Sequence, residues 1–545
     1  MVSYKASLFI FLSCMLIGEV WSQDRYAIHY RYKTSESYSL DRPNEFLTAD
    51  AIQRRVREGV PVDSTDLPVS SLYISQITPK VEQVLYHSNW LNASLVKAEI
   101  NQIDSIKTLP FVEDVILVGR GKGPQLENSR KSYNEPLKIK GLNKRQQTFE
   151  FQNDILGIPH MHEDGYTGKG MKIAVFDAGF ANADKISAMQ HLFERGQILG
   201  TRDFVLPGTT DVFRSDSHGT GALSLMAAYD PDRMIAGAYD ASYILCITED
   251  VDSEFWIEEY NWVKAAEFAD SLGVDIINSS LGYNIFDDVD MNYSKEDMDG
   301  MTTIITKGAS MAALKGILVV TSNGNEGNLS WRTITAPADA ADILAVGAIS
   351  NSLEKAGFSS VGPTADGRIK PELVAYGTGV TLWRYTSGPS FSSGTSFSAP
   401  QIAALAAGLW EANPKWTRAQ VKEKLLQSGH QFSDPDMNLG YGIPNYSRVM
   451  YGVVNEVEET ELAIQPTKIY PNPLDGNTLF VAYTQSNFCQ LNLFSTSGQL
   501  INHWQLARNF QHAPFELSLE KVTPGLYIIE LQDGNGAELF KFWRK

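Results

Sequence analysis

Short apolar runs alternate with longer helical patterns through the middle of the chain. Four runs are typical of strands buried on both faces: 172–176, 243–247, 274–278 and 317–321. Three longer stretches have helical periodicity: 254–272, 295–313 and 396–412. Because strands and helices alternate, we predict right-handed crossovers and a doubly wound, mainly parallel α/β domain over residues 151–450. A ligand site in such a domain is expected at the carboxyl ends of the strands.

The segments on either side have different patterns. Residues 23–120 predict a small α+β unit with strands at 26–32, 69–75 and 115–118 and helices at 47–57 and 100–109. Residues 121–150 are polar, basic and interrupted by Gly and Pro, which is typical of an exposed linker open to proteolysis, so we expect a processing site there.

The C-terminal part changes character again. An acidic linker over 451–465 is followed by short alternating strands, such as 491–494 and 526–531, with Gly and Pro between them. This pattern predicts a small β-sandwich over 466–545.

The first residues resemble an export signal. Residues 1–22 contain one cation, an apolar stretch and a small-residue cleavage pattern, which predicts a signal peptide. A lipid anchor at Cys14 is disfavoured because the apolar run continues beyond it. Later runs stay short of the about 18 apolar residues of a membrane span, so we expect no transmembrane segment.

Composition narrows the function classes further. The 545 residues include 64 acidic and 46 basic side chains, giving a net charge of −18 that would repel a phosphate backbone. We therefore expect no nucleic-acid partner. The 3 cysteines are too few and too scattered for a disulfide framework or a cysteine-built zinc site.

Four polar side chains stand where reactive groups are expected, and each also has an ordinary structural explanation. Asp177 ends a strand, where it could be a turn residue, and His218 begins a small-residue helix, where it could be a surface residue. Asn325 lies in a glycine-flanked turn, and Ser396 begins a helix, where serine is a common cap.

Together, the order Asp, His, Asn, Ser on an α/β pattern resembles the subtilisin-like serine proteases. The resemblance covers residues 157 to about 426 and depends on Phe-Asp177, Ser-His218-Gly-Thr, Asn325-Glu-Gly and Gly-Thr-Ser396-Phe-Ser-Ala-Pro. It implies a subtilisin-like fold in which Ser396 is the nucleophile, His218 the base and Asp177 its partner. Asn325 is the implied oxyanion donor.

Further roles follow from the same resemblance. Ser280, Leu281 and Gly282 are the implied edge that pairs with an extended protein or peptide substrate. Ala178, Gly221 and Phe397 depart from residues usual in the family without removing a reacting group. The resemblance leaves room for structural calcium, but no acidic segment has convincing ligand spacing, so no metal or other cofactor is assigned.

The flanking units also resemble known modules. The N-terminal unit resembles a protease propeptide, with a retained accessory domain as the alternative. The C-terminal unit resembles the type A sorting domain of the type IX secretion system, with a carbohydrate-binding sandwich as its structural rival. These resemblances imply a secreted or cell-surface serine endopeptidase that meets the type IX secretion machinery. The alternative from another class is a catalytically silent adhesin that retains a protease fold.

Overall fold

The computed structural model describes residues 23–34, 37–121, 149–452, 468–482, 488–496, 498–507, 515–533 and 536–545. The predicted signal peptide lies outside the described residues, as does most of each predicted linker.

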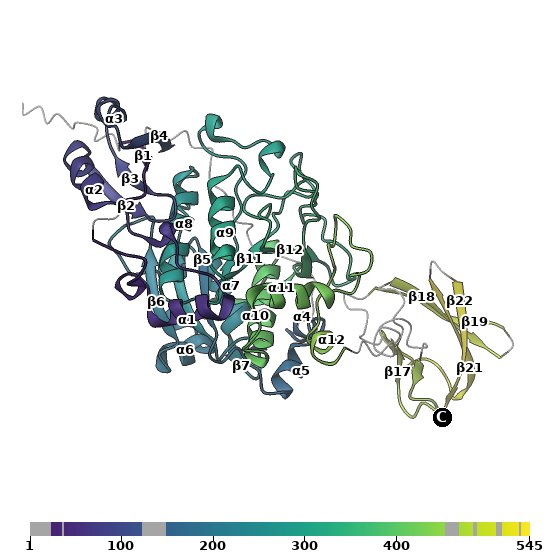
Figure 1. Ribbon diagram of the computed structural model, residues 1–545. Helices are drawn as coiled ribbons and strands as arrows, with labels where there is room; N and C mark the ends of the chain where they lie inside the picture. The colour runs from purple at the N-terminus through teal and green to yellow at the C-terminus, as the bar shows by residue number, and fades with distance from the viewer. Residues whose placement is uncertain are drawn as a thin grey trace, which may run out of the picture.

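A seven-stranded sheet forms the centre of the molecule (Figure 1), with strand order β13-β12-β11-β10-β5-β9-β6 and parallel pairing throughout. The strands are β5 (Lys172–Asp177), β6 (Ile198–Asp203), β9 (Ser242–Ile247), β10 (Ile276–Ser279), β11 (Leu318–Ser322), β12 (Leu344–Ile349) and β13 (Leu373–Tyr376). The predicted doubly wound α/β domain is confirmed, and all four predicted runs are strands of this sheet.

Each face of the sheet is covered by helices because successive strand residues point to opposite sides. In β5, Ile173 and Val175 join one apolar core, whereas Ala174 and Phe176 join the other. The first core includes α7 (His218–Ala227) and α10 (Thr395–Ala412), and the second includes α8 (Ile257–Ser271) and α9 (Ile304–Leu314). Further elements of this unit are α4 (Glu150–Asp154), α5 (Ile158–Glu163), α6 (Gln190–Glu194), β7 (Tyr229–Asp230), β8 (Met234–Ile235), β14 (Val380–Tyr385), β15 (Gly388–Ser392), α11 (Arg418–Gln427) and α12 (Tyr446–Tyr451).

The predicted helix over 295–313 was too long at its N-terminal end. Residues Lys295–Asp297 form a single 3₁₀ turn, and α9 begins only after Thr303, whose side chain accepts a hydrogen bond from Thr306 N–H. Gly300 interrupts the pattern because its φ of +85° belongs to the left-handed region, which a continuous helix excludes.

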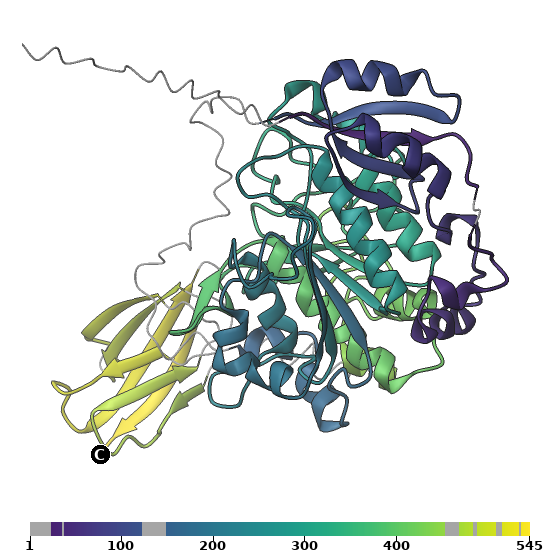
Figure 2. The ribbon, with the colours of Figure 1, turned by 90° about the vertical axis from the view of Figure 1, so that its left-hand side faces the viewer.

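The N-terminal unit contains an antiparallel sheet with strand order β2-β3-β1-β4, confirming the predicted α+β class. Its elements are β1 (Arg25–Tyr30), α1 (Ala49–Glu58), α2 (Ser71–Ile77), β2 (Gln83–Ser88), β3 (Ala93–Lys97), α3 (Ile100–Lys107) and β4 (Val112–Gly119). Figure 2 shows α8 and α9 (teal) between this unit (purple) and the central sheet, where Trp90 and Leu95 join the core around these helices.

The strand predicted at 69–75 was wrong, because this segment contains the start of helix α2. Val69 and Ile77 are buried in the core of the N-terminal unit, with Tyr73 and Ile74 packed against it. That spacing is the period of a helix face, which the alternating reading of a shorter window concealed.

The C-terminal unit is built from strands alone, in two sheets ordered β16-β17-β20 and β19-β18-β21-β22. Its strands are β16 (Lys468–Tyr470), β17 (Thr478–Ala482), β18 (Phe488–Ser495), β19 (Leu500–Ala507), β20 (Phe515–Ser518), β21 (Gly525–Asp533) and β22 (Gly536–Arg544). Leu479 and Leu517 of one sheet share an apolar core with Leu491 and Ile529 of the other, which makes the unit a sandwich as predicted.

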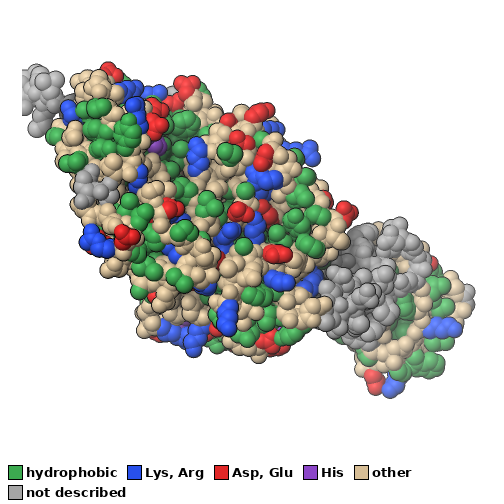
Figure 3. All heavy atoms as spheres, viewed as in Figure 1, with side chains coloured by type: hydrophobic (Ala, Val, Ile, Leu, Met, Phe, Trp, Pro, Cys, Tyr) green, Lys and Arg blue, Asp and Glu red, His purple; other side chains and the backbone are tan. Residues whose placement is uncertain are grey.

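Two observations on helices and surface charge bear on the expected partners. Among the described residues, no helix combines the length and the apolar character needed to cross a bilayer. On the face shown in Figure 3, acidic and basic side chains are interspersed with apolar and polar ones.

Candidate active site

The carboxyl ends of the parallel strands bring distant segments to one edge of the sheet. Asp177 is the last residue of β5, and its side chain is fully buried. His218 is the first residue of α7, which begins at the same edge. Gly219 allows this approach, because a Cβ there would lie 2.7 Å from Cβ of Asp177 and 2.5 Å from the carbonyl oxygen of Gly179.

Asp177 and His218 form a hydrogen-bonded pair. Nδ1 of His218 lies 2.9 Å from Oδ1 and 3.1 Å from Oδ2 of Asp177. Because a carboxylate only accepts hydrogen bonds, Nδ1 carries the proton, which leaves Nε2 of a neutral ring as an acceptor. The backbone N–H of His218 donates to Asp216 Oδ1 at 2.6 Å, which fixes the start of the helix.

Two opposing effects set the pKa of His218. Burial lowers the pKa by disfavouring the charged ring, whereas the charge of Asp177 and its hydrogen bond raise it, and the net pKa is raised above the ordinary histidine value. Arg384 opposes the rise weakly. The ring is therefore a stronger base than a free imidazole, and its protonated form is stabilised by Asp177.

Ser396 lies at the start of α10, in the same cleft as His218. Its side-chain oxygen donates to the carbonyl oxygen of Ser280 at 3.1 Å, and the hydroxyl of Ser280 donates back to the carbonyl of Ser396 at 2.8 Å. Ser396 is 7% exposed, so its hydroxyl is reached only through the cleft. Its backbone N–H belongs to the first turn of the helix, where no intrahelical acceptor is available.

The amide of Asn325 is oriented by Thr395. Oδ1 of Asn325 accepts hydrogen bonds from the backbone N–H of Thr395 at 2.9 Å and from its hydroxyl at 3.0 Å. A backbone N–H can only donate, so the oxygen must be the atom on this side. The two N–H bonds of Nδ2 are thereby left for the cleft, which Asn325 lines together with Ser396.

The cleft has a volume of about 310 Å³, and Ser280, Leu281 and Gly282 line it beside Ser396 and His218. Leu281 and Ser280 are buried, and the carbonyl oxygen of Leu281 accepts a hydrogen bond from Ser322 at 3.2 Å. Gly282 has no room for a side chain, since a Cβ would lie 2.3 Å from Oγ1 of Thr335. The structure thus brings together all seven residues singled out in the sequence.

The cleft residues that sequence reasoning missed include Arg384 on β14 and Thr335. Arg384 donates to Ser217 Oγ at 3.2 Å and lies 3.4 Å from a carboxylate oxygen of Asp216. Gly221 leaves space for it, because a Cβ there would lie 3.2 Å from Cγ of Arg384. A lone cation within the apolar run of β14 was the available signal for Arg384, whereas Thr335 had none.

Within the described residues, Glu249, Glu254 and Glu258 are the group of side chains that could hold a metal ion, with ligand atoms within 4.8 Å of one another. All three are buried. Calcium takes 6–8 oxygen ligands, more than three carboxylates supply by single oxygens. Burial lowers the pKa of the Arg25 guanidinium, and the charges of Asp250 and Glu258, the second of them in this group, oppose that lowering. The residues do not make a convincing calcium site, and no metal is assigned.

A parallel sheet that presents an aspartate–histidine pair beside a helix-start serine at one edge defines the class as a subtilisin-like serine protease. Comparison with family models places the chain within that class: residues 168–443, just over half of it, match the subtilase family, peptidase S8, and the chain belongs to this family. Residues 25–134 match the peptidase S8 propeptide domain of Bacteroidota. Residues 468–543 match a secretion system C-terminal sorting domain, which indicates secretion by the type IX route.

Curated relatives agree with this assignment. Subtilisin from Bacillus pumilus is 29% identical over 293 residues, 53% of this chain and 93% of that protein. Subtilisin NAT from Bacillus subtilis subsp. natto is 29% identical over 273 residues, which is 49% of this chain and 62%, less than two thirds, of that protein. Among solved structures, MycP1 from Mycobacterium smegmatis is similar at 20% identity with a TM-score of 0.44, covering 57% of this chain and 86% of that one.

Proposed function

We propose that this protein is an exported serine endopeptidase that hydrolyses peptide bonds in proteins or peptides through an acyl-enzyme intermediate. One observation carries the proposal: the His218–Asp177 pair, at 2.9 Å, faces a cleft that Ser396 and Asn325 also line. The nucleophile, its base, the partner of the base and an oxyanion donor are thus available in one place.

The reaction begins at Ser396. Its hydroxyl turns from the carbonyl of Ser280 towards Nε2 of His218, since a hydroxyl has one proton to donate. As Nε2 takes the proton, Oγ attacks the peptide carbonyl carbon, and Asp177 stabilises the imidazolium that forms. His218 then protonates the leaving amine, and water repeats the sequence to release the acyl group.

Negative charge on the carbonyl oxygen is stabilised at the same edge. Nδ2 of Asn325 and the backbone N–H of Ser396 donate to it, and Thr395 holds the amide of Asn325 in the productive orientation. Ser280, Leu281 and Gly282 form the side of the cleft against which the substrate chain lies. The N-terminal unit acts as a propeptide that is separated from the catalytic unit by cleavage within residues 121–150.

Labelling with a serine-directed fluorophosphonate probe tests the proposal. Wild type is expected to label, whereas Ser396→Ala is not. Ser393→Ala is the matched control, because Ser393 lines the same cleft but its hydroxyl accepts from the N–H of Gly379 at 2.9 Å. Equal labelling of wild type and Ser396→Ala would show that the nucleophile is wrong. A catalytically silent adhesin is not favoured, and it would leave all three proteins unlabelled.

A further inference from the structure

In the described part of the chain, the N-terminal unit makes two adjoining contacts with the catalytic unit. At the first, its sheet packs against α8, where Trp90 is buried and its backbone N–H donates to Oε1 of Glu267 at 3.0 Å. At the second, α1 lies away from the sheet of its own unit (Figure 1) and contacts the C-terminal ends of α8 and α9 instead. An N-terminal unit that only covered the cleft would not need this second contact.

Helix α1 approaches the catalytic unit too closely for side chains to intervene. Gly273 follows α8, and a Cβ there would lie 2.7 Å from the backbone of Asp50 and Ala51. Gly316 follows α9, and a Cβ there would lie 2.4 Å from Cγ of Glu58. Two glycines of the catalytic unit, Gly273 and Gly316, therefore lie directly against helix α1 of the N-terminal unit.

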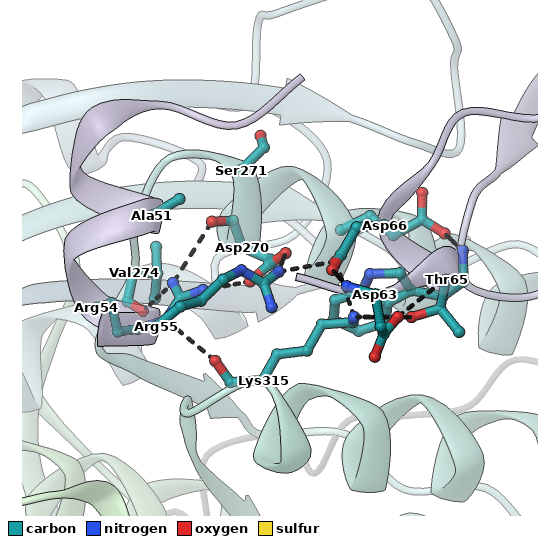
Figure 4. Close-up of polar contacts among 12 residues, drawn as sticks. Ala51, Arg54, Arg55, Asp63, Thr65, Asp66, Asp270, Ser271, Val274 and Lys315 are labelled. Carbon is teal, nitrogen blue, oxygen red and sulfur yellow. Dashed lines mark hydrogen bonds and ion pairs between the residues drawn. The ribbon is translucent and has the colours of Figure 1, made fainter. Parts of the chain in front are cut away.

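The centre of this contact is a buried network of charges (Figure 4). Arg54 of α1 pairs with Asp270 of α8, and Arg55 joins Asp270 at 2.7 Å to Asp66 at 2.8 Å. Lys315 of the catalytic unit lies 2.8 Å from the same oxygen of Asp66. The side chains of all five residues are at most 4% exposed.

The network also satisfies the ends of two helices. Arg54 donates to the carbonyl oxygen of Val274 at 2.9 Å and to that of Lys315 at 3.3 Å. These carbonyls follow the C-terminal ends of α8 and α9, where the helix dipoles are negative. Three buried cations thus face two buried carboxylates and two helix ends, so the positive excess is compensated.

The charged residues of this network come from both units, so each unit supplies groups that compensate charges of the other. Asp270 and Lys315 come from the catalytic unit, whereas Arg54, Arg55 and Asp66 come from the N-terminal unit. Removing one partner of such a buried group leaves a charge uncompensated, which is far costlier than breaking an exposed pair. At the rim, Arg57 pairs with Asp275 at 2.9 Å and lies 4.6 Å from the centre of the ring of Trp410.

We propose that α1 and the turn Ser64–Asp66 form an ionic anchor that keeps the cut N-terminal unit bound to the catalytic unit. The anchor lies away from the cleft and adjoins the sheet contact, where Nζ of Lys315 is 5.6 Å from the centre of the ring of Trp90. None of the contacts described above involves residues 122–148, so cutting the chain there removes none of them. The partner that this surface fits is the N-terminal unit itself as a separate polypeptide. The inference depends on the propeptide assignment and not on the catalytic triad.

The test uses the full chain carrying Ser396→Ala, with a site for an added sequence-specific protease inserted within residues 122–148. The protein is immobilised through its C-terminal end, cut, and the loss of mass is followed by interferometry. Because the readout is mass and not activity, failure of the anchor is distinguishable from failure of the proposed nucleophile.

The wild-type anchor is expected to hold the N-terminal unit after cutting. Arg54→Gln and Asp270→Asn should each raise the dissociation rate on the order of a hundredfold. Because the two side chains pair with each other, the double variant should raise the rate by less than the product of the two single increases. Arg42→Gln is the matched control, because its exposed pair with Glu45 lies within the N-terminal unit, and it should dissociate at the wild-type rate.

Two results would overturn the proposal. The first is loss of the N-terminal unit from the wild-type chain as soon as it is cut. The second is dissociation of Arg54→Gln or Asp270→Asn at the same rate as Arg42→Gln. Thermal unfolding of the uncut chains checks that each variant is folded, and Lys315→Met replaces any that is not, with the same expected acceleration.

Discussion

Replacing Asn325 by leucine tests the oxyanion assignment most directly. Leucine keeps the approximate size of the side chain but removes both N–H donors. Because Thr395 occupies Oδ1 with two hydrogen bonds, Nδ2 is the part of the amide left to bind the developing oxyanion. Its loss should lower kcat by about 10²–10³, equivalent to about 2.7–4 kcal/mol, which is the effect of removing the oxyanion asparagine of subtilisin itself.

The structure adds a second consequence that separates catalysis from stability. Asn325→Leu also leaves the N–H and the hydroxyl of Thr395 without their acceptor, which should cost about 1–3 kcal/mol of folding free energy. Thr395→Val is the matched control, because it removes one of these two bonds and leaves both donors of Asn325. It should lower kcat by less than about tenfold.

The assay is steady-state hydrolysis of a peptide anilide, with kcat and KM determined separately, together with urea unfolding of each variant. A group that acts only in the transition state lowers kcat and leaves KM nearly unchanged. A rise in KM at constant kcat for Asn325→Leu, or equal kcat losses for Asn325→Leu and Thr395→Val, would refute the reasoning.

Three further predictions follow from other contacts. The acid limb of kcat/KM should have its midpoint above pH 6.5, because the raised pKa of His218 keeps the ring protonated and unable to accept a proton up to that higher pH. Asp177→Asn should lower the imidazole pKa measured by NMR, and an unchanged value would contradict the pairing. Burial raises the pKa of Glu259 to about 8, compared with 4.5 in the unfolded chain. The folded protein therefore holds this proton more tightly, and the free energy of unfolding that it contributes below pH 4.5 is lost as the pH rises to about 8. In a catalytically inactive background, Glu259→Gln should abolish this loss of unfolding free energy, which is on the order of 4 kcal/mol between pH 5 and pH 9. If the urea midpoints of the variant and of its parent fall by the same amount between these two pH values, the prediction is contradicted. Gly282→Ala should lower kcat/KM by at least about tenfold through collision with Thr335, and adding Thr335→Ala should restore it; equal losses in the single and double variants would exclude that contact as the cause.

The sequence determined the order of the elements and the residues brought to the edge of the central sheet. Asp177 ends an apolar run, and His218 and Ser396 begin helices, so the topology of a parallel sheet already placed them together. Local patterns failed where two periods were both compatible with a short window, as at 69–75, or where one glycine changed the chain direction, as at Gly300.

Tertiary structure alone decided which distant groups face one another. The orientation of the Asn325 amide depends on Thr395, 70 positions further along the chain, and the environment of Arg384 depends on the space left at Gly221. The ionic anchor joins Arg54 to Asp270 across 216 positions. Sequence patterns report local periodicity and strand ends, whereas burial, hydrogen-bond partners and charge compensation depend on three-dimensional packing, which no single segment encodes.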